Sequence, residues 1–388
     1  MRFLRGAFHP PSFHENTGER KATWMELFFD LAFVVAIAAT AHSLSSAEST
    51  RGLIEFCVLF VLLQWAWTGY TFYNDRFDSD DLLHRASGLA QMALVLFLST
   101  LSKWLTDDYL QFVVAYSLLR FFTIAFNLFA GFHVPAARRL THTFAFGFSV
   151  ALVPLVLGLG VDDPDWRLAL VSATALLQLV PPLLPTRHLA SLPLSISHIP
   201  ERLGLFVTLT LGECLTGIAR ISSTDHKTAS LILGSACAIT IVFCFWWIYF
   251  SQLNGNLLKQ LSLRSRFWVY GHVPLTLTLV ILAVGLEEQL ELIVHPANAA
   301  RTSLLFLAWG SALICLAAIH GTSKPAGSAM AEIVQVVITV LFGTASLAML
   351  IVPWSPRPIV GLEIVSVMGA ILVLLDVWAG GRADLANS

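Results

Sequence analysis

The chain has 388 residues, of which 56% are hydrophobic and only 12% are charged. Because about a quarter of the residues of a soluble globular protein are charged, this composition indicates a protein of the lipid bilayer. The formal net charge of −2 lacks the basic excess that nucleic-acid binding requires, so no nucleic-acid partner is expected. The five cysteines lie in apolar runs without a CxxC pair, which argues against a disulfide framework and a zinc site.

Apolar runs of about 20 residues, the length that crosses a bilayer, recur along the chain. Polar, proline or glycine breaks separate these runs, which predicts an all-α integral membrane protein of about twelve transmembrane helices. The predicted helices are 24–45, 53–73, 84–105, 109–131, 140–160, 166–185, 201–222, 228–251, 267–287, 301–320, 330–352 and 359–379.

The first predicted helix opens with TWMELFFDLAFVVAI (23–37), which places two carboxylates one turn apart. Thr23 followed by Glu26 fits a capping box at the helix start. Asp30 lies deeper, about 10 Å along the axis at ~1.5 Å per residue. A carboxylate at that depth needs a partner or water in the bundle interior. Asp30 is expected to meet either Asn127 or His133, toward the cytoplasmic end of the fourth predicted helix.

The loop YNDRFDSDD (73–81) follows the second predicted helix and contains Asp75, Asp78, Asp80 and Asp81. Carboxylates in such a cluster can hold a hard cation such as Mg²⁺. The spacing resembles the NDxxDxxxD motif of intramembrane prenyltransferases, except that the last aspartate comes one residue early. The second acidic motif of those enzymes is missing, because 186–200 contains no acid. The alternative interpretation is a solvated loop whose aspartates cap helices.

Three ionisable residues lie further along, inside predicted helices. Arg120 and Glu213 lie near the middle of the fourth and seventh, at similar depth. A buried ion pair between them would join the two halves of the chain, and such a pair could serve a pathway or only lock the bundle. His272 precedes Pro274, which would free nearby backbone groups.

The chain also shows a weak internal repeat. Glu19-Arg20 precedes the first predicted helix and Glu201-Arg202 begins the seventh, and QWAWTGYTFY (64–73) is matched by FCFWWIYF (243–250). Six helices in each half give the halves one orientation, as in parallel-repeat transporters. These four charged residues are expected at a cytoplasmic gate.

Lys and Arg are concentrated at both termini and in the loops after the even-numbered helices. The positive-inside rule therefore predicts that both termini are cytoplasmic. The expected organisation is a cytoplasmic segment, a first six-helix repeat, a short central loop, a second repeat and a cytoplasmic tail, at 1–23, 24–185, 186–200, 201–379 and 380–388.

Several of these stretches together resemble the bacterial low-temperature-requirement protein A (LtrA) family. They are ERKATWMELFFDLAFVVAI (19–37), the Asp-rich loop, Arg120, HIPERLGLFVTLTLGE (198–213), WWIYF (246–250) and YGHVPL (270–275). Ser251 departs from the acidic residue expected after WWIYF. The resemblance implies a multi-pass protein of the bacterial inner membrane, and it supplies no reaction.

Transport is the leading functional prediction, since buried ionisable residues at a repeat interface bind protons, ions or charged solutes. The protein would be a secondary transporter or an ion or proton pathway, with the bilayer and a small ion or solute as partners. Its predicted site residues are Glu26, Asp30, Arg120, Asn127, Glu213 and His272. The alternative is an Mg²⁺-dependent enzyme acting on a lipid or isoprenoid diphosphate through loop 74–81, the only case that implies a cofactor. A third possibility is a structural or sensory protein.

Overall fold

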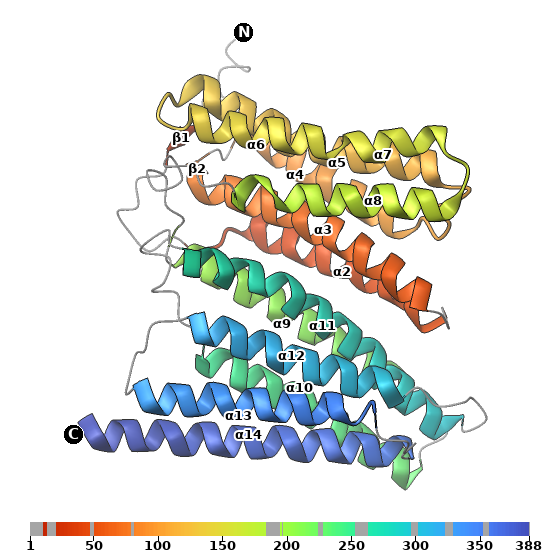
Figure 1. The fold of residues 1–388 in the computed structure, drawn as a ribbon, viewed down its shortest axis with the longest axis vertical. Coiled ribbons are helices and arrows are strands. Elements are labelled where there is room, and N and C mark those ends of the chain that lie inside the picture. The colour runs from red at the N-terminus through yellow and green to blue at the C-terminus, as the bar shows by residue number, and fades with distance from the viewer. Residues whose placement is uncertain are drawn as a thin grey trace. The chain divides into compact units, whose positions relative to one another are not determined.

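The computed structural model describes residues 11–13, 21–46, 50–78, 81–183, 195, 197–223, 228–252, 263–295, 302–322, 329–351 and 357–387. Almost all of these residues are helical (Figure 1). Two short strands, β1 (Ser12–Phe13) and β2 (Phe77–Asp78), pair antiparallel, and the sequence analysis did not predict them. The chain divides into two compact units, Met1–Leu205 with Leu258–Ser262, and Phe206–Leu257 with Leu263–Ser388.

The first unit is built around α3, which packs against α2, α5 and α8. The α4 helix packs against both α2 and α5, and α6 packs against α5 and α8. The described elements of this unit are α2 (Trp24–Ser46), α3 (Thr50–Arg76), α4 (Leu82–Ser99), α5 (Tyr109–His133), α6 (Arg138–Ala151), α7 (Val153–Leu157), η1 (Gly158–Gly160), α8 (Pro164–Leu179), η2 (Pro181–Leu183) and the first two turns of α9 (His198–Ser222).

Caps and prolines set several of these boundaries. The Asp81 side chain accepts a hydrogen bond from the His84 backbone N–H at 2.8 Å and so caps α4. Asp163 caps α8 in the same way, with Pro164 at the first helical position, where proline is well tolerated. Pro154 lacks a backbone N–H, and the predicted helix 140–160 is accordingly interrupted between α6 and α7.

The second unit contains α10 (Ala229–Gln252), α11 (Leu263–Val294), α12 (Thr302–Thr322), α13 (Ala329–Ala348), α14 (Pro358–Asn387) and the rest of α9. The α12 helix packs between α11 and α13, and α14 packs against α10 and α11. The α12 and α13 backbones approach closely at Gly310, where an added Cβ would lie 2.8 Å from the Gly343 carbonyl oxygen. Such contacts between small residues are typical of helices packed in membranes.

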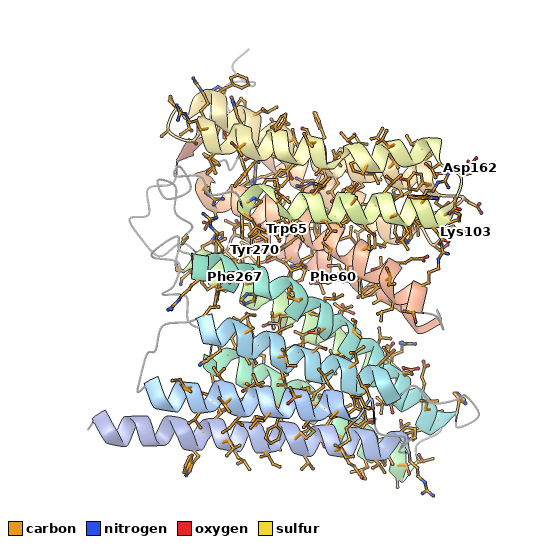
Figure 2. The ribbon with its side chains drawn as sticks, in the orientation of Figure 1. Phe60, Trp65, Lys103, Asp162, Phe267 and Tyr270 are labelled. Carbon is orange, nitrogen blue, oxygen red and sulfur yellow. The ribbon has the colours of Figure 1, made fainter. Side chains whose placement is uncertain are left out.

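Eleven described helices are long and apolar enough to cross a membrane. The predicted helix 330–352 corresponds to α13, whose described apolar segment, Ile333–Ala348, is shorter than the other spans. Large apolar side chains such as Trp24, Phe146 and Leu374 are exposed on the helices, as lipid-facing residues are. Lys103 and Asp162 lie at one end of the first unit, in the connections after α4 and η1 (Figure 2). The predicted all-α membrane architecture is therefore confirmed.

Candidate functional site

Glu26 caps α2 and also belongs to a buried network of charged side chains. The Glu26 backbone N–H donates to Thr23 Oγ1 at 3.2 Å, and the Thr23 N–H donates to Glu26 Oε2 at 2.9 Å. This reciprocal pair confirms the predicted capping box. Glu26 Oε1 also lies 3.1 Å from Nη1 of Arg202, and Glu26 is only 3% exposed. This carboxylate therefore both takes part in the cap of α2 and contacts Arg202.

Asp30, one turn further into α2, forms a bidentate ion pair with Arg202 of α9. Nε of Arg202 donates to Oδ2 at 2.9 Å, and Nη2 donates to Oδ1 at 2.6 Å. The indole N–H of Trp67 also donates to Oδ1, at 2.6 Å. The predicted partners Asn127 and His133 are therefore wrong. Asn127 donates to the Thr123 carbonyl instead, and His133 contacts the Phe129 carbonyl oxygen.

The His198 ring lies between two carboxylates. Its Nδ1 is 2.9 Å from Oδ1 of Asp75, and its Nε2 is 3.3 Å from Oε2 of Glu26. An ionised carboxylate can only accept hydrogen bonds, so both contacts require N–H groups if both acids are ionised. The three side chains therefore hold either a doubly protonated imidazole or a neutral one beside a protonated acid.

Counting charges shows why that proton matters. The network contains the carboxylates of Glu26, Asp30 and Asp75, all at most 4% exposed. Its permanent cations are Arg202 and Arg76. Arg76 is also buried, its charge interacts with that of Asp75, and it donates to the Phe72 carbonyl oxygen at 3.2 Å. Three negative charges face two positive ones, and a doubly protonated His198 makes the balance neutral. Unbalanced charge is costly in a low-dielectric interior, so a proton belongs in this cluster.

Helix periodicity brings the network together. Glu26 and Asp30 are four residues apart on α2, and His198 and Arg202 are four apart on α9, so each pair shares a helix face. Both cross-helix contacts join residues separated by 172 positions, so the two helix starts run parallel and in register. Trp67, Thr71 and Asp75 repeat the four-residue spacing on α3. Asp75 additionally accepts the Ser195 backbone N–H at 2.8 Å.

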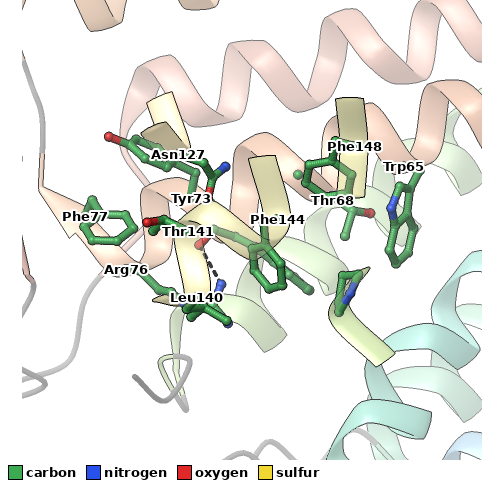
Figure 3. Close-up of a pocket in the computed structure, with 13 residues that line it drawn as sticks. Trp65, Thr68, Tyr73, Arg76, Phe77, Asn127, Leu140, Thr141, Phe144 and Phe148 are labelled. Atoms are coloured by element: carbon green, nitrogen blue, oxygen red, sulfur yellow. Dashed lines mark hydrogen bonds between the residues drawn. The ribbon is translucent and has the colours of Figure 1, made fainter. Parts of the chain in front are cut away.

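The opposite face of α3 borders a cavity (Figure 3). Trp65, Thr68 and Phe148 lie at one end of it, and Arg76 and Phe77 lie at the other. The remaining lining residues are Gly69, Phe72, Tyr73, Asn127, Leu140, Thr141, Phe144 and Pro182. The cavity has a volume of about 20 Å³, which is room for a water molecule.

Arg120 lies against the walls of this cavity. Its Nη1 donates to the Trp65 carbonyl oxygen at 3.3 Å, and its Cζ lies 4.3 Å from the centre of the Phe148 ring. The residue is completely buried. Glu213, its predicted partner, belongs to the second unit, where it accepts a hydrogen bond from the Thr216 hydroxyl at 3.3 Å. The Arg120–Glu213 ion pair stays a prediction.

The aspartates of the Asp-rich loop make different contacts. Asp75 takes part in the network and Asp81 caps α4. The Asp78 side chain and Asp80 lie outside the described residues. Among the residues that the structure describes, no three histidines, cysteines or acids gather in a way that could hold a metal ion. Two of the four proposed Mg²⁺ ligands, Asp75 and Asp81, therefore have protein partners, and the Mg²⁺ site stays a prediction.

The remaining predicted residues are placed as follows. His272 is fully buried in the second unit, where Nδ1 faces the Trp268 carbonyl oxygen at 2.8 Å and Nε2 faces the Tyr249 hydroxyl at 3.1 Å. A neutral imidazole satisfies both contacts. Glu201 is exposed and accepts the Ala22 backbone N–H at 3.3 Å. Glu19 and Arg20 lie outside the described residues.

Arg202 was predicted at a cytoplasmic gate, and the structure places it fully buried. The α9 helix begins at His198, three residues before the predicted start, because Pro200 is tolerated in the first turn of a helix. Arg202 therefore lies one turn inside α9 and not at its end. The sequence analysis also missed His198 and Trp67 as site residues. The four-residue spacing of His198 and Arg202, complementary to that of Glu26 and Asp30, was the available signal.

Eleven apolar helices in the described part of the chain, with a charged network buried among them, define a multi-pass membrane protein. The family described as bacterial low temperature requirement A protein (LtrA) matches residues 21–373, and the chain belongs to this family. It is also 25% identical over 322 residues to a protein of Rhizobium meliloti (strain 1021) described as uncharacterized. That match covers 78% of this chain and 77% of the relative.

Proposed function

We propose that this protein is a secondary transporter or proton pathway of the bacterial inner membrane, in which the Glu26–His198–Asp75 cluster carries a proton. The contact of both His198 ring nitrogens with carboxylates supports this proposal most directly. Histidine changes its protonation near physiological pH more readily than other side chains. Ionisable residues within membrane-spanning helices are by default candidates for ion or proton pathways.

The network also offers a way to couple protonation to movement. Losing the proton on His198 leaves three buried carboxylates facing two arginines, so the contact of α9 with α2 and α3 weakens. Binding of a proton restores the charge balance and this packing. A carrier needs two packing arrangements whose balance changes with its ligand.

A parallel repeat, with both termini cytoplasmic, belongs to the same proposal. Each unit contains a tyrosine–histidine contact between its corresponding helices: Tyr70 Oη to His84 Nε2 in the first and Tyr249 Oη to His272 Nε2 in the second, both 3.1 Å long. Equivalent contacts at equivalent places support an internal duplication. Transporters of this kind carry substrate and ion sites where their repeats meet.

The direct test is proton flux in liposomes containing the purified protein, under a pH gradient or an imposed voltage. We expect His198→Gln and Asp30→Asn to abolish the flux, since the first removes the titrating ring and the second removes the charge that holds Arg202. His133→Gln, at an exposed histidine of α5, is the matched control and should conduct normally. Normal flux through His198→Gln would refute the assignment of the proton to this cluster.

The enzyme alternative predicts that activity depends on the aspartates of the Asp-rich loop. In that case Asp75 and Asp81 would be metal ligands, and replacing either would remove a ligand. In the structure, each of them has a protein partner. Mg²⁺-dependent turnover of an isoprenoid diphosphate by the purified protein, lost in Asp81→Asn, would favour the enzyme over the transporter.

A further inference from the structure

Asp376 is a carboxylate of the second unit that lies inside a membrane span without a cation beside it. It belongs to α14, two residues before the end of the span Pro358–Trp378. The indole N–H of Trp247 on α10 donates to its Oδ2 at 3.2 Å, and the side-chain amide of Gln335 on α13 donates to its Oδ1. No Lys, Arg or His that the structure describes forms an ion pair with it. A carboxylate within a span requires compensation, which a ligand can supply.

A cavity lies beside this carboxylate, between α10, α13 and α14. Its polar lining consists of Asp376, Gln335 and Thr339, and its other lining residues are aliphatic except for Trp378. The volume is about 40 Å³, which is room for about three water-sized groups. Trp378 is 56% exposed and Val334, also in the lining, is 43% exposed. The cavity therefore borders the surface of the unit, and a ligand can reach it from there.

The three polar residues of the lining provide acceptor oxygens and no positive charge. Each carboxylate oxygen of Asp376 accepts one hydrogen bond and has a lone pair left for a second. The Gln335 amide uses its nitrogen on Asp376, and its oxygen has no hydrogen-bond partner among the described residues. The Thr339 hydroxyl donates its hydrogen to the Gln335 backbone carbonyl at 2.9 Å, so its own lone pairs are left to accept. A ligand that matches this lining is a cation with several N–H donors.

We propose that this cavity binds the primary ammonium group of a membrane lipid such as phosphatidylethanolamine. The three N–H donors of an ammonium match the three residues with acceptor oxygens, and its charge compensates that of Asp376. The end of a span lies at the depth of the lipid headgroups, where tryptophans are enriched. Trp247 and Trp378 are exposed at this level, and the faces of such rings attract ammonium groups.

The lipid site is separate from the proposed proton pathway. It is formed entirely by residues of the second unit, whereas Glu26, Asp75 and His198 belong to the first. Lipid binding is measured without any flux, and His198→Gln should bind the lipid as the wild type does. Each proposal can therefore fail without the other.

The test is native mass spectrometry of the purified full-length protein in detergent, titrated separately with three lipids of the same acyl chains. We expect saturable binding of phosphatidylethanolamine in preference to phosphatidylcholine, whose quaternary ammonium has no N–H, and to phosphatidylglycerol, which has no ammonium. Asp376→Asn should weaken the binding by at least about tenfold, the equivalent of ~1.4 kcal/mol. Glu363→Gln removes another acid of α14, outside the cavity lining, and is the matched control that should bind normally.

A second variant and two competitors keep the test decisive if Asp376→Asn does not fold. Thr339→Val preserves shape while removing the hydroxyl, and should weaken phosphatidylethanolamine binding several-fold. Equal binding of the three lipids, or wild-type binding by both variants, would overturn the proposal. Free ethanolamine and Na⁺ identify the source of the cation. Saturable binding of either one that Asp376→Asn abolishes, without any preference among the lipids, would overturn the lipid assignment in favour of a free cation.

Discussion

Two buried arginines of the first unit differ in the groups that compensate their charge. Arg202 makes a bidentate pair with Asp30 and lies against Glu26. Arg120, equally buried, contacts a carbonyl oxygen and an aromatic ring and has no carboxylate partner in the described part of the chain. The first arrangement holds three helices together, and the second leaves donors directed at no protein acceptor. Burial alone therefore does not tell a charge with a carboxylate partner from one without.

The sharpest way to test this comparison is to make the same substitution at both arginines. Arg202→Met leaves two carboxylates buried without their cation, and we expect the free energy of unfolding in mixed micelles to fall by about 3–5 kcal/mol. Replacing both partners, as in Asp30→Leu combined with Arg202→Met, should recover a large part of that loss. A control, Lys103→Met, breaks an exposed pair with Asp107 and should leave stability unchanged. Equal stability of Arg202→Met and wild type would contradict the structural role.

The second prediction concerns the aromatic donor that supports this pair. Trp67→Phe removes the indole N–H that reaches Asp30 at 2.6 Å. A hydrogen bond to a charged group contributes about 1.5–3 kcal/mol, so unfolding should become easier by an amount in that range. Trp166→Phe, at an exposed tryptophan of α8, provides the control and should have little effect. If the two variants were equally stable, the Trp67 bond would contribute nothing beyond packing.

Arg120→Met should change stability in the opposite direction. The substitution removes a buried charge that has no carboxylate partner among the described residues, and we expect a gain of about 1–2 kcal/mol, since apolar replacement of buried charges is often stabilising. The lost cation–π contact with Phe148 keeps the gain small. A marked loss of stability would show that Arg120 is paired after all.

Sequence patterns predicted the fold better than the partners. Hydropathy located the helices because a bilayer span needs a long apolar run, and Asp30 was identified because a carboxylate inside such a run needs compensation. Its partner was out of reach, since Arg202 lies 172 residues away in the chain and only the packing of α9 brings it near. Starting the seventh predicted helix at residue 201 hid the location of His198 and Arg202 in the first two turns of α9.

Asp81 offers the smallest and most diagnostic effect, because it tests whether the Asp-rich loop is structural or catalytic. Its carboxylate accepts the His84 backbone N–H as the cap of α4. Asn caps helices about as well as Asp, whereas replacing a cap by Ala typically costs about 1 kcal/mol. We therefore expect Asp81→Asn to unfold as the wild type does and Asp81→Ala to lose about 1 kcal/mol. Proton flux in liposomes should be unchanged in Asp81→Asn. If Asp81→Asn lost flux while its stability stayed normal, the charge of Asp81 would belong to the functional machinery, and the boundary of the site would extend from the His198 network to the start of α4.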